Sequence, residues 1–511
     1  AARRPAPLRA IVPIVGMTDP GGEWAHPNGA LGGHSFARFG LLNLMMQLLP
    51  PIARFHSTEE QRRWFERLDA TEPYIVDLFR HGPTDPVWSN RAVDAAEISV
   101  PALCFSGWRD SLCDSTVRAY ERLRGPKRLI MGPWTHTMPH ASPFEPIDFL
   151  WLALRWWDQW LRGIETGIMD EPPVALYVQG RRPGWRGYDS WPPGSEAGLN
   201  LVSDPAGVLA LRDGADGAHA SAEIGRYEPD PTVGALSGLW GISTGGIGLP
   251  LDQQADDARS FCVTSEGLER DVLIVGRPRV VLELAGPARR IVARLADVDE
   301  RGRSSFIAGG IVVPRDEAAR QEVELWPTCY RVSAGHRLRV VVSDAAFPRL
   351  WPLADAEPIG ISALELFAPT VRDEHGCTVS FPRPSQTGPA MGATFEGDWR
   401  ITHDLVADAL EVVVGHKSMA HTPAPQHALG SESSIRAAVG RRAPQAAKLE
   451  ITENATARLE TGERIAVTTG AQLTSETLWV KGEVEIDDML IFSRVWRERR
   501  ASQPNDRNGG C

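Results

Sequence analysis

The chain has 511 residues, of which 42% are hydrophobic and 23% charged, a composition typical of globular proteins. This length exceeds that of one ordinary domain, so we expect two or three domains. The net charge of −11 argues against nucleic acid or an anionic membrane surface as the main partner. The apolar runs at residues 41–52 and 149–161 are shorter than the roughly 20 residues that a membrane span needs.

Three short apolar runs in the first third of the chain each end at a glycine. They are residues 8–15, 101–106 and 128–131, which end at Gly16, Gly107 and Gly132. Continuous apolar runs of this length are typical of buried parallel strands. A helical pattern over 115–124 links the last two runs, which predicts a strand-helix-strand unit. In such sheets the chemistry gathers at the carboxyl ends of the strands.

We interpret residues 1–22 and 99–170 as two parts of one α/β core, with residues 23–98 inserted between them as a helical cap. Residues 36–52 and 58–68 have helical patterns, and Ser57 with Glu60 is a helix-start signal. A tryptophan-rich helix is expected over 148–162. Caps of this kind shape a pocket and exclude water from it.

After residue 170 the apolar pattern changes to a period of two, which is typical of a β-sandwich or barrel. The expected strands are residues 174–178, 280–284, 291–295, 338–342, 410–414, 464–469, 478–484 and 489–492. We interpret 171–497 as one β domain. Residues 422–447 are rich in Pro, Ser, Ala and Gly and are expected to form a long loop, and the polar residues 498–511 a disordered tail.

Asp110 and His136 follow two neighbouring predicted strands and lie 26 residues apart. Both should therefore lie at one edge of one sheet. There a carboxylate can hold one imidazole nitrogen while the other accepts a proton from a nucleophile. Taken singly, Asp110 is equally compatible with a turn residue and His136 with an ordinary loop histidine. The spacing alone leaves both interpretations open.

The residues around these two side chains resemble a known family. Gly107-Trp-Arg-Asp110 is similar to the G-W-x-D motif, and Gly132-Pro-Trp-Thr-His136 to the G-P-W-x-H motif, of CocE/NonD hydrolases. That group includes cocaine esterase, α-amino-acid ester hydrolases and X-prolyl dipeptidyl-peptidases. The resemblance continues to about residue 380 through Trp191-Pro-Pro193, Asp297-Val-Asp299, Gly335-His-Arg-Leu-Arg339 and Phe347-Pro-Arg349.

The resemblance implies a partial α/β-hydrolase domain with a helical cap, followed by a jelly-roll β-sandwich. It implies that Asp110 is the acid and His136 the base of a serine hydrolase triad. The family's nucleophile lies in a G-x-S-x-G elbow between a strand and a helix. The nearest segment here is Gly33-His-Ser-Phe-Ala37, which lacks the second glycine and a preceding strand.

We therefore expect no nucleophile in this chain. Ala1 resembles the end of the family's nucleophile helix, so the serine is expected upstream and the chain alone is expected to be inactive. The oxyanion donors would be missing with the serine, and one such donor contributes about 10²–10³ in rate. A protein of another class remains an alternative: a non-catalytic binding or assembly protein that has lost the nucleophile.

The resemblance implies a small ester, amide or short peptide as substrate and no metal or organic cofactor. A homo-oligomer is compatible with it, and neither nucleic acid nor a membrane is an expected partner. The six cysteines form no C-x-x-C pair and fit scattered thiols in a reducing compartment, so we expect a cytoplasmic protein. A signal peptide stays compatible with a chain that opens at Ala1 rather than at a methionine.

Overall fold

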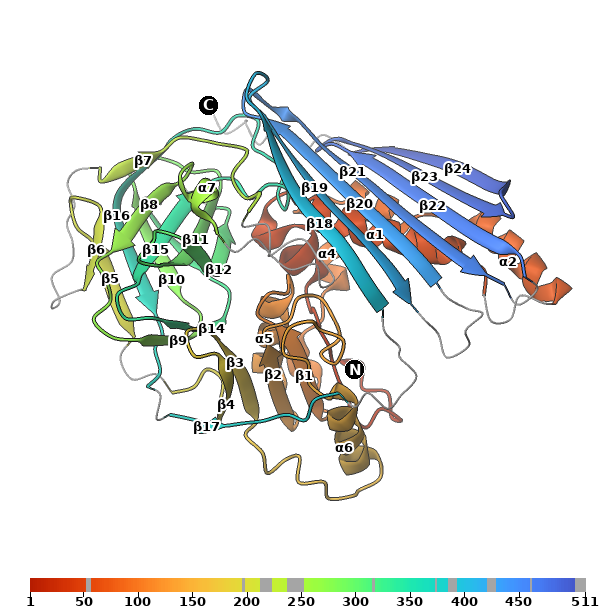
Figure 1. Cartoon of the computed structure of the whole chain (residues 1–511), viewed down its shortest axis with the longest axis horizontal. Helices are drawn as coiled ribbons and strands as arrows, with labels where there is room; N and C mark the ends of the chain where they lie inside the picture. Colours follow the sequence, from red (N-terminus) through yellow and green to blue (C-terminus); the bar gives the residue numbers. More distant parts are fainter. Residues whose placement is uncertain are drawn as a thin grey trace. The chain divides into compact units, whose positions relative to one another are not determined.

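The computed structural model describes residues 1–51, 57–194, 198–211, 223–236, 252–314, 318–372, 375–384, 393–420, 429–459 and 462–500. The chain divides into two compact units, which can be followed by colour in Figure 1. The first unit contains Ala1–Ala30 and Trp88–Gln386, and the second contains Leu31–Val87 and Thr387–Cys511. Each unit is therefore built from two separate stretches of chain.

The first unit contains a parallel sheet whose strands are buried on both faces. Its strands are β1 (Ala102–Gly107), β2 (Lys127–Gly132) and β3 (Val174–Gly180). β1 pairs with β2 and β2 with β3, all in parallel, so the three strands end at one edge. The run expected as a strand over 8–15 lies parallel to β1 through two bridges, Ile11 to Ala102 and Ile14 to Phe105. Pro13, which has no N–H to donate, lies between these bridges.

Two helices cover the two faces of this sheet. α5 (Cys113–Arg122) contributes Val117 and Tyr120 to a core with Leu129 of β2. α6 (Phe149–Leu161) places Trp156 in the opposite core, and the carboxylate of its N-cap residue Asp148 accepts a hydrogen bond from the N–H of Trp151. Short helical elements complete the unit: Pro20–Ala25, Pro27–Gly29, α4 (Val87–Arg91), Ala95–Glu97 and α7 (Gln254–Asp257).

The parallel sheet continues without a break into the β part of the same unit. The strand order is β1-β2-β3-β14-β9, and β14 pairs in parallel with β3. A second, ten-stranded sheet has the order β12-β11-β15-β8-β6-β5-β16-β10-β13, with β7 beside β16. Its inward residues, such as Val280, Leu282 and Leu284 of β10, form one core at alternate positions. This alternation is the period of two on which the sequence prediction rests.

The strands of this β part have the following bounds: β4 (Gly184–Tyr188), β5 (Leu199–Ser203), β6 (Val208–Leu211), β7 (Gly225–Tyr227), β8 (Phe261–Ser265), β9 (Val272–Gly276), β10 (Arg279–Leu284), β11 (Ile291–Val298), β12 (Ser304–Val312), β13 (Arg320–Glu324), β14 (Thr328–Val332), β15 (Arg337–Ser343), β16 (Ile359–Ala368) and β17 (Cys377–Thr378).

The second unit is a seven-stranded antiparallel sheet in which each strand pairs with the next along the chain. The strands are β18 (Ala393–Asp404), β19 (Ala409–Ala420), β20 (Leu429–Gly440), β21 (Ala443–Arg458), β22 (Arg464–Leu473), β23 (Thr477–Ile486) and β24 (Met489–Arg499). The inserted segment supplies its helices, which are α1 (His34–Leu48), α2 (Thr58–Ala70) and α3 (Tyr74–Arg80). α1 packs on β21, β22 and β23, and α3 packs on β24.

The expected fold class, α/β followed by β structure, is confirmed, but the loop expected over 422–447 is wrong. Of that range, residues 429–440 and 443–447 belong to the paired strands β20 and β21, and residues 422–428 lie outside the described residues. The inward positions of β20 include Ser433 and Ala437, whose small side chains conceal the alternation.

Two other expectations differ from the structure at the carboxyl end. The single β domain expected over 171–497 contains two separate sheets, one in each unit. β24 continues to Arg499, so it enters the expected tail at 498, and residues 501–511 lie outside the described residues. Among the described residues no helix is long and apolar enough to cross a membrane.

Candidate active site

The carboxyl ends of β1 and β2 meet in a close backbone junction. Gly107 lies opposite Gly132, and a Cβ built on Gly107 would lie 2.0 Å from the carbonyl oxygen of Trp134. The N–H of Trp108 donates to the carbonyl of Gly132 at 2.9 Å, and the N–H of Arg109 to that of Trp134 at 3.1 Å. Only glycine fits at 107, because any side chain there would separate the two loops.

Two tryptophans fix the loops that follow the strands. The indole N–H of Trp108 donates to the carbonyl of Tyr177 at 2.8 Å, and that of Trp134 to the carbonyl of Glu145 at 3.1 Å. Both rings are buried. A Cβ on Gly132 would lie 2.3 Å from the Trp134 ring, so this glycine makes room for the indole.

This junction brings Asp110 and His136 together. His136 Nδ1 lies 2.9 Å from Asp110 Oδ2, within the 2.6–3.2 Å that we expect for a positioned base. Asp110 Oδ1 accepts the N–H of Leu112 at 2.8 Å, so both carboxylate oxygens have partners. An ionised carboxylate can only accept, so Nδ1 carries the proton and Nε2 the lone pair.

Exposure differs sharply between the two side chains. The Asp110 side chain is 0% exposed, whereas that of His136 is 44% exposed. A buried carboxylate that holds an accessible imidazole is the arrangement that a general base requires, because the ring is oriented from inside and reachable from outside. The structure thus brings the two predicted residues together, while their catalytic role stays a prediction.

Two serines lie in or near an elbow pattern, and neither is close to this pair in the sequence. Ser35 lies in the first turn of α1, in the second unit, whereas Asp110 and His136 belong to the first. The expectation that residues 33–37 are the nearest segment is wrong, because the chain contains one full G-x-S-x-G pattern, Gly241-Ile-Ser-Thr-Gly245. It lies outside the described residues and after His136, whereas α/β-hydrolases have the order Ser, Asp, His.

A second histidine–aspartate pair lies in the β part, where the sequence analysis noted the two motifs but not their contact. His336 Nδ1 is 2.7 Å from Asp297 Oδ1, and the Tyr330 hydroxyl donates to Asp297 Oδ2 at 3.0 Å. Burial raises the pKa of Tyr330, so the hydroxyl stays a donor. The three residues connect β11, β14 and the turn before β15. We regard this pair as a structural cross-link.

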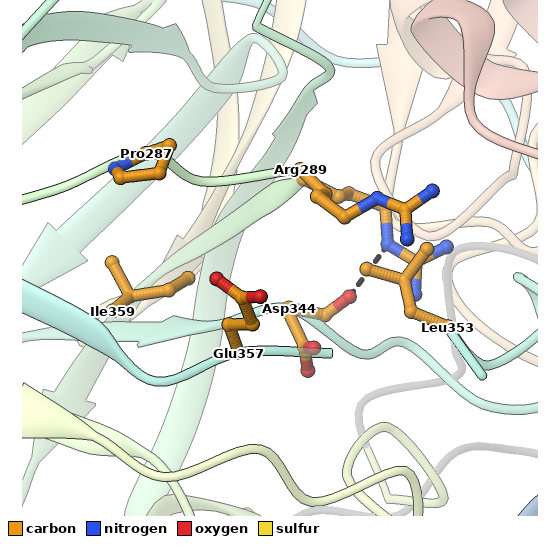
Figure 2. A pocket seen from close by; sticks show the side chains of 7 residues that line it. Pro287, Arg289, Asp344, Leu353, Glu357 and Ile359 are labelled. Carbon is orange, nitrogen blue, oxygen red and sulfur yellow. Dashed lines mark hydrogen bonds between the residues drawn. The ribbon is translucent and has the colours of Figure 1, made fainter. Parts of the chain in front are cut away.

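A small cavity of about 40 Å³ lies in the β part, and neither Asp110 nor His136 lines it. Figure 2 shows Arg289, Asp344 and Glu357 around it. The buried Arg290 also lines it and donates to the carbonyl oxygens of Asp344 and Trp351. Its volume suits water-sized molecules. Within the described ranges, no group of three or more His, Cys, Asp or Glu side chains could hold a metal ion.

The parallel sheet with an aspartate and a histidine at its carboxyl edge defines an α/β-hydrolase type of protein. Two family models match consecutive parts of the chain. The X-Pro dipeptidyl-peptidase (S15 family) model matches residues 1–138, and the model of the X-Pro dipeptidyl-peptidase C-terminal non-catalytic domain matches residues 166–373. The chain is therefore similar to X-Pro dipeptidyl-peptidases of the S15 family over two consecutive stretches, each shorter than half of its length.

Curated relatives and solved structures show further similarities. Proteins named "Putative serine esterase" from Mycobacterium bovis and Mycobacterium tuberculosis are each 28% identical over 47% of this chain. The match covers 44% of each relative, so the chain spans less than half of the length of these relatives. The second model's range contains Ser243, in a domain described as non-catalytic.

Three solved structures share the fold at low identity. A CocE/NonD family hydrolase from Staphylococcus aureus has a TM-score of 0.53 at 16% identity, over 72% of this chain and 69% of its own. An α-amino acid ester hydrolase has 0.54 at 17%, over 72% and 73%. An aminopeptidase from a marine sediment archaeon, Thaumarchaeota archaeon, has 0.52 at 17%, over 71% and 72%.

The junction at Gly107 gives a first prediction. Gly107→Ala should destabilise the first unit by about 3 kcal/mol or more, because the new methyl group would overlap a backbone carbonyl that cannot rotate away. Gly184→Ala is the matched control, since a Cβ on this strand glycine meets no atom within 4 Å. Thermal unfolding of both variants measures the effect. Equal melting temperatures would contradict the close approach of the two loops.

The hydrogen bond of the dyad gives a second prediction. Asp110→Asn should change the His136 tautomer from Nδ1–H to Nε2–H, because an amide can donate to Nδ1 where a carboxylate cannot. Nitrogen-15 NMR of histidine-labelled protein distinguishes the two forms. His403, which is paired with Asp408 in the second unit, should keep its spectrum. An unchanged His136 signal would mean that Asp110 does not set the tautomer.

Proposed function

We propose that this chain is part of a serine hydrolase that cleaves an ester or an amide, including a peptide bond, through a Ser-Asp-His triad. Asp110 is the acid and His136 the base, and the serine lies upstream of Ala1. The observation that carries the proposal is the 2.9 Å bond between a fully buried carboxylate and an accessible imidazole at the carboxyl edge of a parallel sheet. The match of residues 1–138 to the model of the X-Pro dipeptidyl-peptidase (S15 family) supports it.

The proposed mechanism follows from the protonation of the dyad. The serine oxygen attacks the acyl carbon while His136 Nε2 takes the hydroxyl proton, and the ring then returns that proton to the departing alcohol or amine. Water repeats the sequence to release the acid. Asp110 holds the Nδ1–H and stabilises the imidazolium that forms in each half-reaction, while its second oxygen stays bonded to the N–H of Leu112. No metal or organic cofactor takes part in this proposal.

An upstream position for the serine is favoured over the two candidates within the chain. Ser35 opens a helix of the second unit and Ser243 follows the base in sequence, so neither matches the order of an α/β-hydrolase. The substrate class, an acyl ester or a short peptide as for a dipeptidyl-peptidase, is proposed from the names of the relatives and the family. Cytoplasmic location is proposed from cysteine usage alone.

A non-catalytic binding or assembly protein is the second candidate. The missing elbow in the α/β part favours it. The intact dyad opposes it, because a buried carboxylate aimed at an accessible histidine has no evident use once the nucleophile is lost. Sequencing upstream of Ala1 separates the two: an in-frame elbow supports the hydrolase, and a start codon at this position supports the binding protein.

Labelling with a fluorophosphonate tests the third prediction. The chain should neither label nor turn over p-nitrophenyl acetate, because the nucleophile and its oxyanion donors are elsewhere. A longer protein that includes the elbow should label. There, His136→Ala should lower kcat by about 10⁶, while His403→Ala should leave it unchanged.

Labelling of the chain as given would contradict the upstream position of the serine. Ser35→Ala and Ser243→Ala would then identify the residue that reacts. A longer protein that has an elbow but neither labels nor loses activity on His136→Ala would contradict the triad itself.

A further inference from the structure

A row of polar side chains crosses the largely apolar inner face of the second unit's sheet. His416 of β19, Ser433 of β20, Glu453 of β21 and Thr469 of β22 are direct cross-strand partners. The next row on the same face is wholly apolar and consists of Val414, Ile435, Ile451, Ala471 and Val480. Ser433, Glu453 and Thr469 are buried, so this row requires partners within the protein.

Helix α1 supplies the partner. The Nε of Arg38 lies 3.7 Å from Glu453 Oε1, and the Ser433 hydroxyl donates to the same oxygen at 2.7 Å. Arg38 Nη2 lies 3.4 Å from His416 Nδ1 and 3.5 Å from His416 Nε2, so the guanidinium lies against the imidazole ring. The later turns of α1 bury Leu41, Leu44 and Leu48, so Arg38 is its ionic attachment to the sheet.

The contact between Arg38 and His416 depends on the charge of the imidazole. A guanidinium has donors only, and it lies close to both ring nitrogens of His416. Neutral histidine carries a lone pair and no charge, so it tolerates this contact. Protonated histidine has no lone pair and places a second positive charge beside Arg38. One proton therefore converts a tolerated contact into a repulsion.

We propose that Arg38, His416 and Glu453 form an acid-sensitive clamp. The clamp fastens helix α1, and with it the inserted segment 31–87, to the carboxyl-terminal sheet. Protonation of His416 opens it. This proposal concerns the second unit alone and does not depend on the proposed hydrolase activity.

The direction of the pH effect follows from His416. Burial, and then the nearby charge of Arg38, lower the pKa of His416 from its ordinary 6.5 to about 4. A histidine with a depressed pKa in the folded state contributes stability that is present above 6.5 and lost as the pH falls toward 4. Attachment of α1 should therefore weaken between these two values.

The titration of Glu453 has the opposite effect on the stability of the clamp. Burial raises its pKa, while Arg38 and Ser433 lower it and so offset part of the rise. A carboxyl with a raised pKa favours the folded state at low pH. We expect His416 to determine the sign of the net pH effect on the attachment of α1. Burial and the charge of Arg38 both lower the pKa of His416, whereas the influences on Glu453 oppose each other.

The other elements around His416 contribute no further carboxylate to this row. β18 places Gly397 opposite His416, and β20 and β22 contribute the hydroxyls of Ser433 and Thr469. On α1, the buried His34 lies one turn before Arg38 and is a second titratable group. The charges of α3 are paired elsewhere: Asp77 lies 3.5 Å from His81, and Arg80 pairs with Glu498.

Two measurements on the full chain test the clamp. Hydrogen exchange, corrected for the intrinsic effect of pH, should show α1 losing protection by roughly tenfold or more between pH 7 and pH 4.5, as linkage to a depressed histidine requires. Helix α6 of the first unit should change less. His416→Gln should abolish the loss in α1, whereas the matched control His403→Gln, at a half-exposed histidine of the same unit, should retain it.

Proton NMR titration supplies the second readout and does not depend on the stability of the His416 variant. The His416 ring should titrate near 4 in the native chain and closer to 6.5 in Arg38→Gln, which removes the neighbouring charge. The clamp is overturned if His416 titrates near 6.5 in the native chain, if Arg38→Gln leaves its pKa unchanged, or if α1 loses protection equally in His416→Gln.

Discussion

The carbonyl of Trp134 occupies the space that a side chain on residue 107 would need. The candidate site depends on this close approach of the two backbones. With glycine at 107, the loops after β1 and β2 bond to each other through their backbones, at 2.9 Å and 3.1 Å. Asp110 and His136 then come within 2.9 Å although 26 residues separate them. The geometry of the dyad is therefore fixed by main-chain hydrogen bonds, which are less tolerant of change than side-chain packing.

Much of the first unit could be predicted from the sequence because its signals are local. The apolar runs ending at Gly107 and Gly132 became β1 and β2, and each polar motif follows its strand directly. The strand over 8–15 was recognised from its apolar residues, but Pro13 limits it to two bridges. The Asp297–His336 contact could not be predicted, because Asp297 lies on β11 and His336 in the turn before β15, and no local pattern connects them.

The second unit could not be predicted in the same way. Its helices come from residues 31–87 and its sheet from residues beyond 387, so the contacts that define it are among the most distant in the chain. Within the sheet, Ser433 and Ala437 occupy inward positions of β20, and small or polar residues at those positions resemble a loop. The sheet and its helices were both hard to predict for the same reason. Their side chains pack against residues far along the chain, and a local sequence pattern does not reveal such contacts.

Three buried carboxylates show why one pair is a candidate site and the others are not. Asp110, Asp297 and Glu453 each have two kinds of donor, as burial of a carboxylate demands. Asp297 binds a histidine that is 26% exposed and also a buried tyrosine, so its contacts connect strands. Glu453 binds a buried arginine that cannot exchange its proton. Only Asp110 among these three combines a backbone donor with a histidine that is nearly half exposed. A catalytic pair requires that the partner of the buried charge remain accessible to substrate. An aspartate beside a histidine is not sufficient, since Asp297 and His336 also form such a pair. Accessibility of the histidine therefore distinguishes the site at the carboxyl ends of β1 and β2.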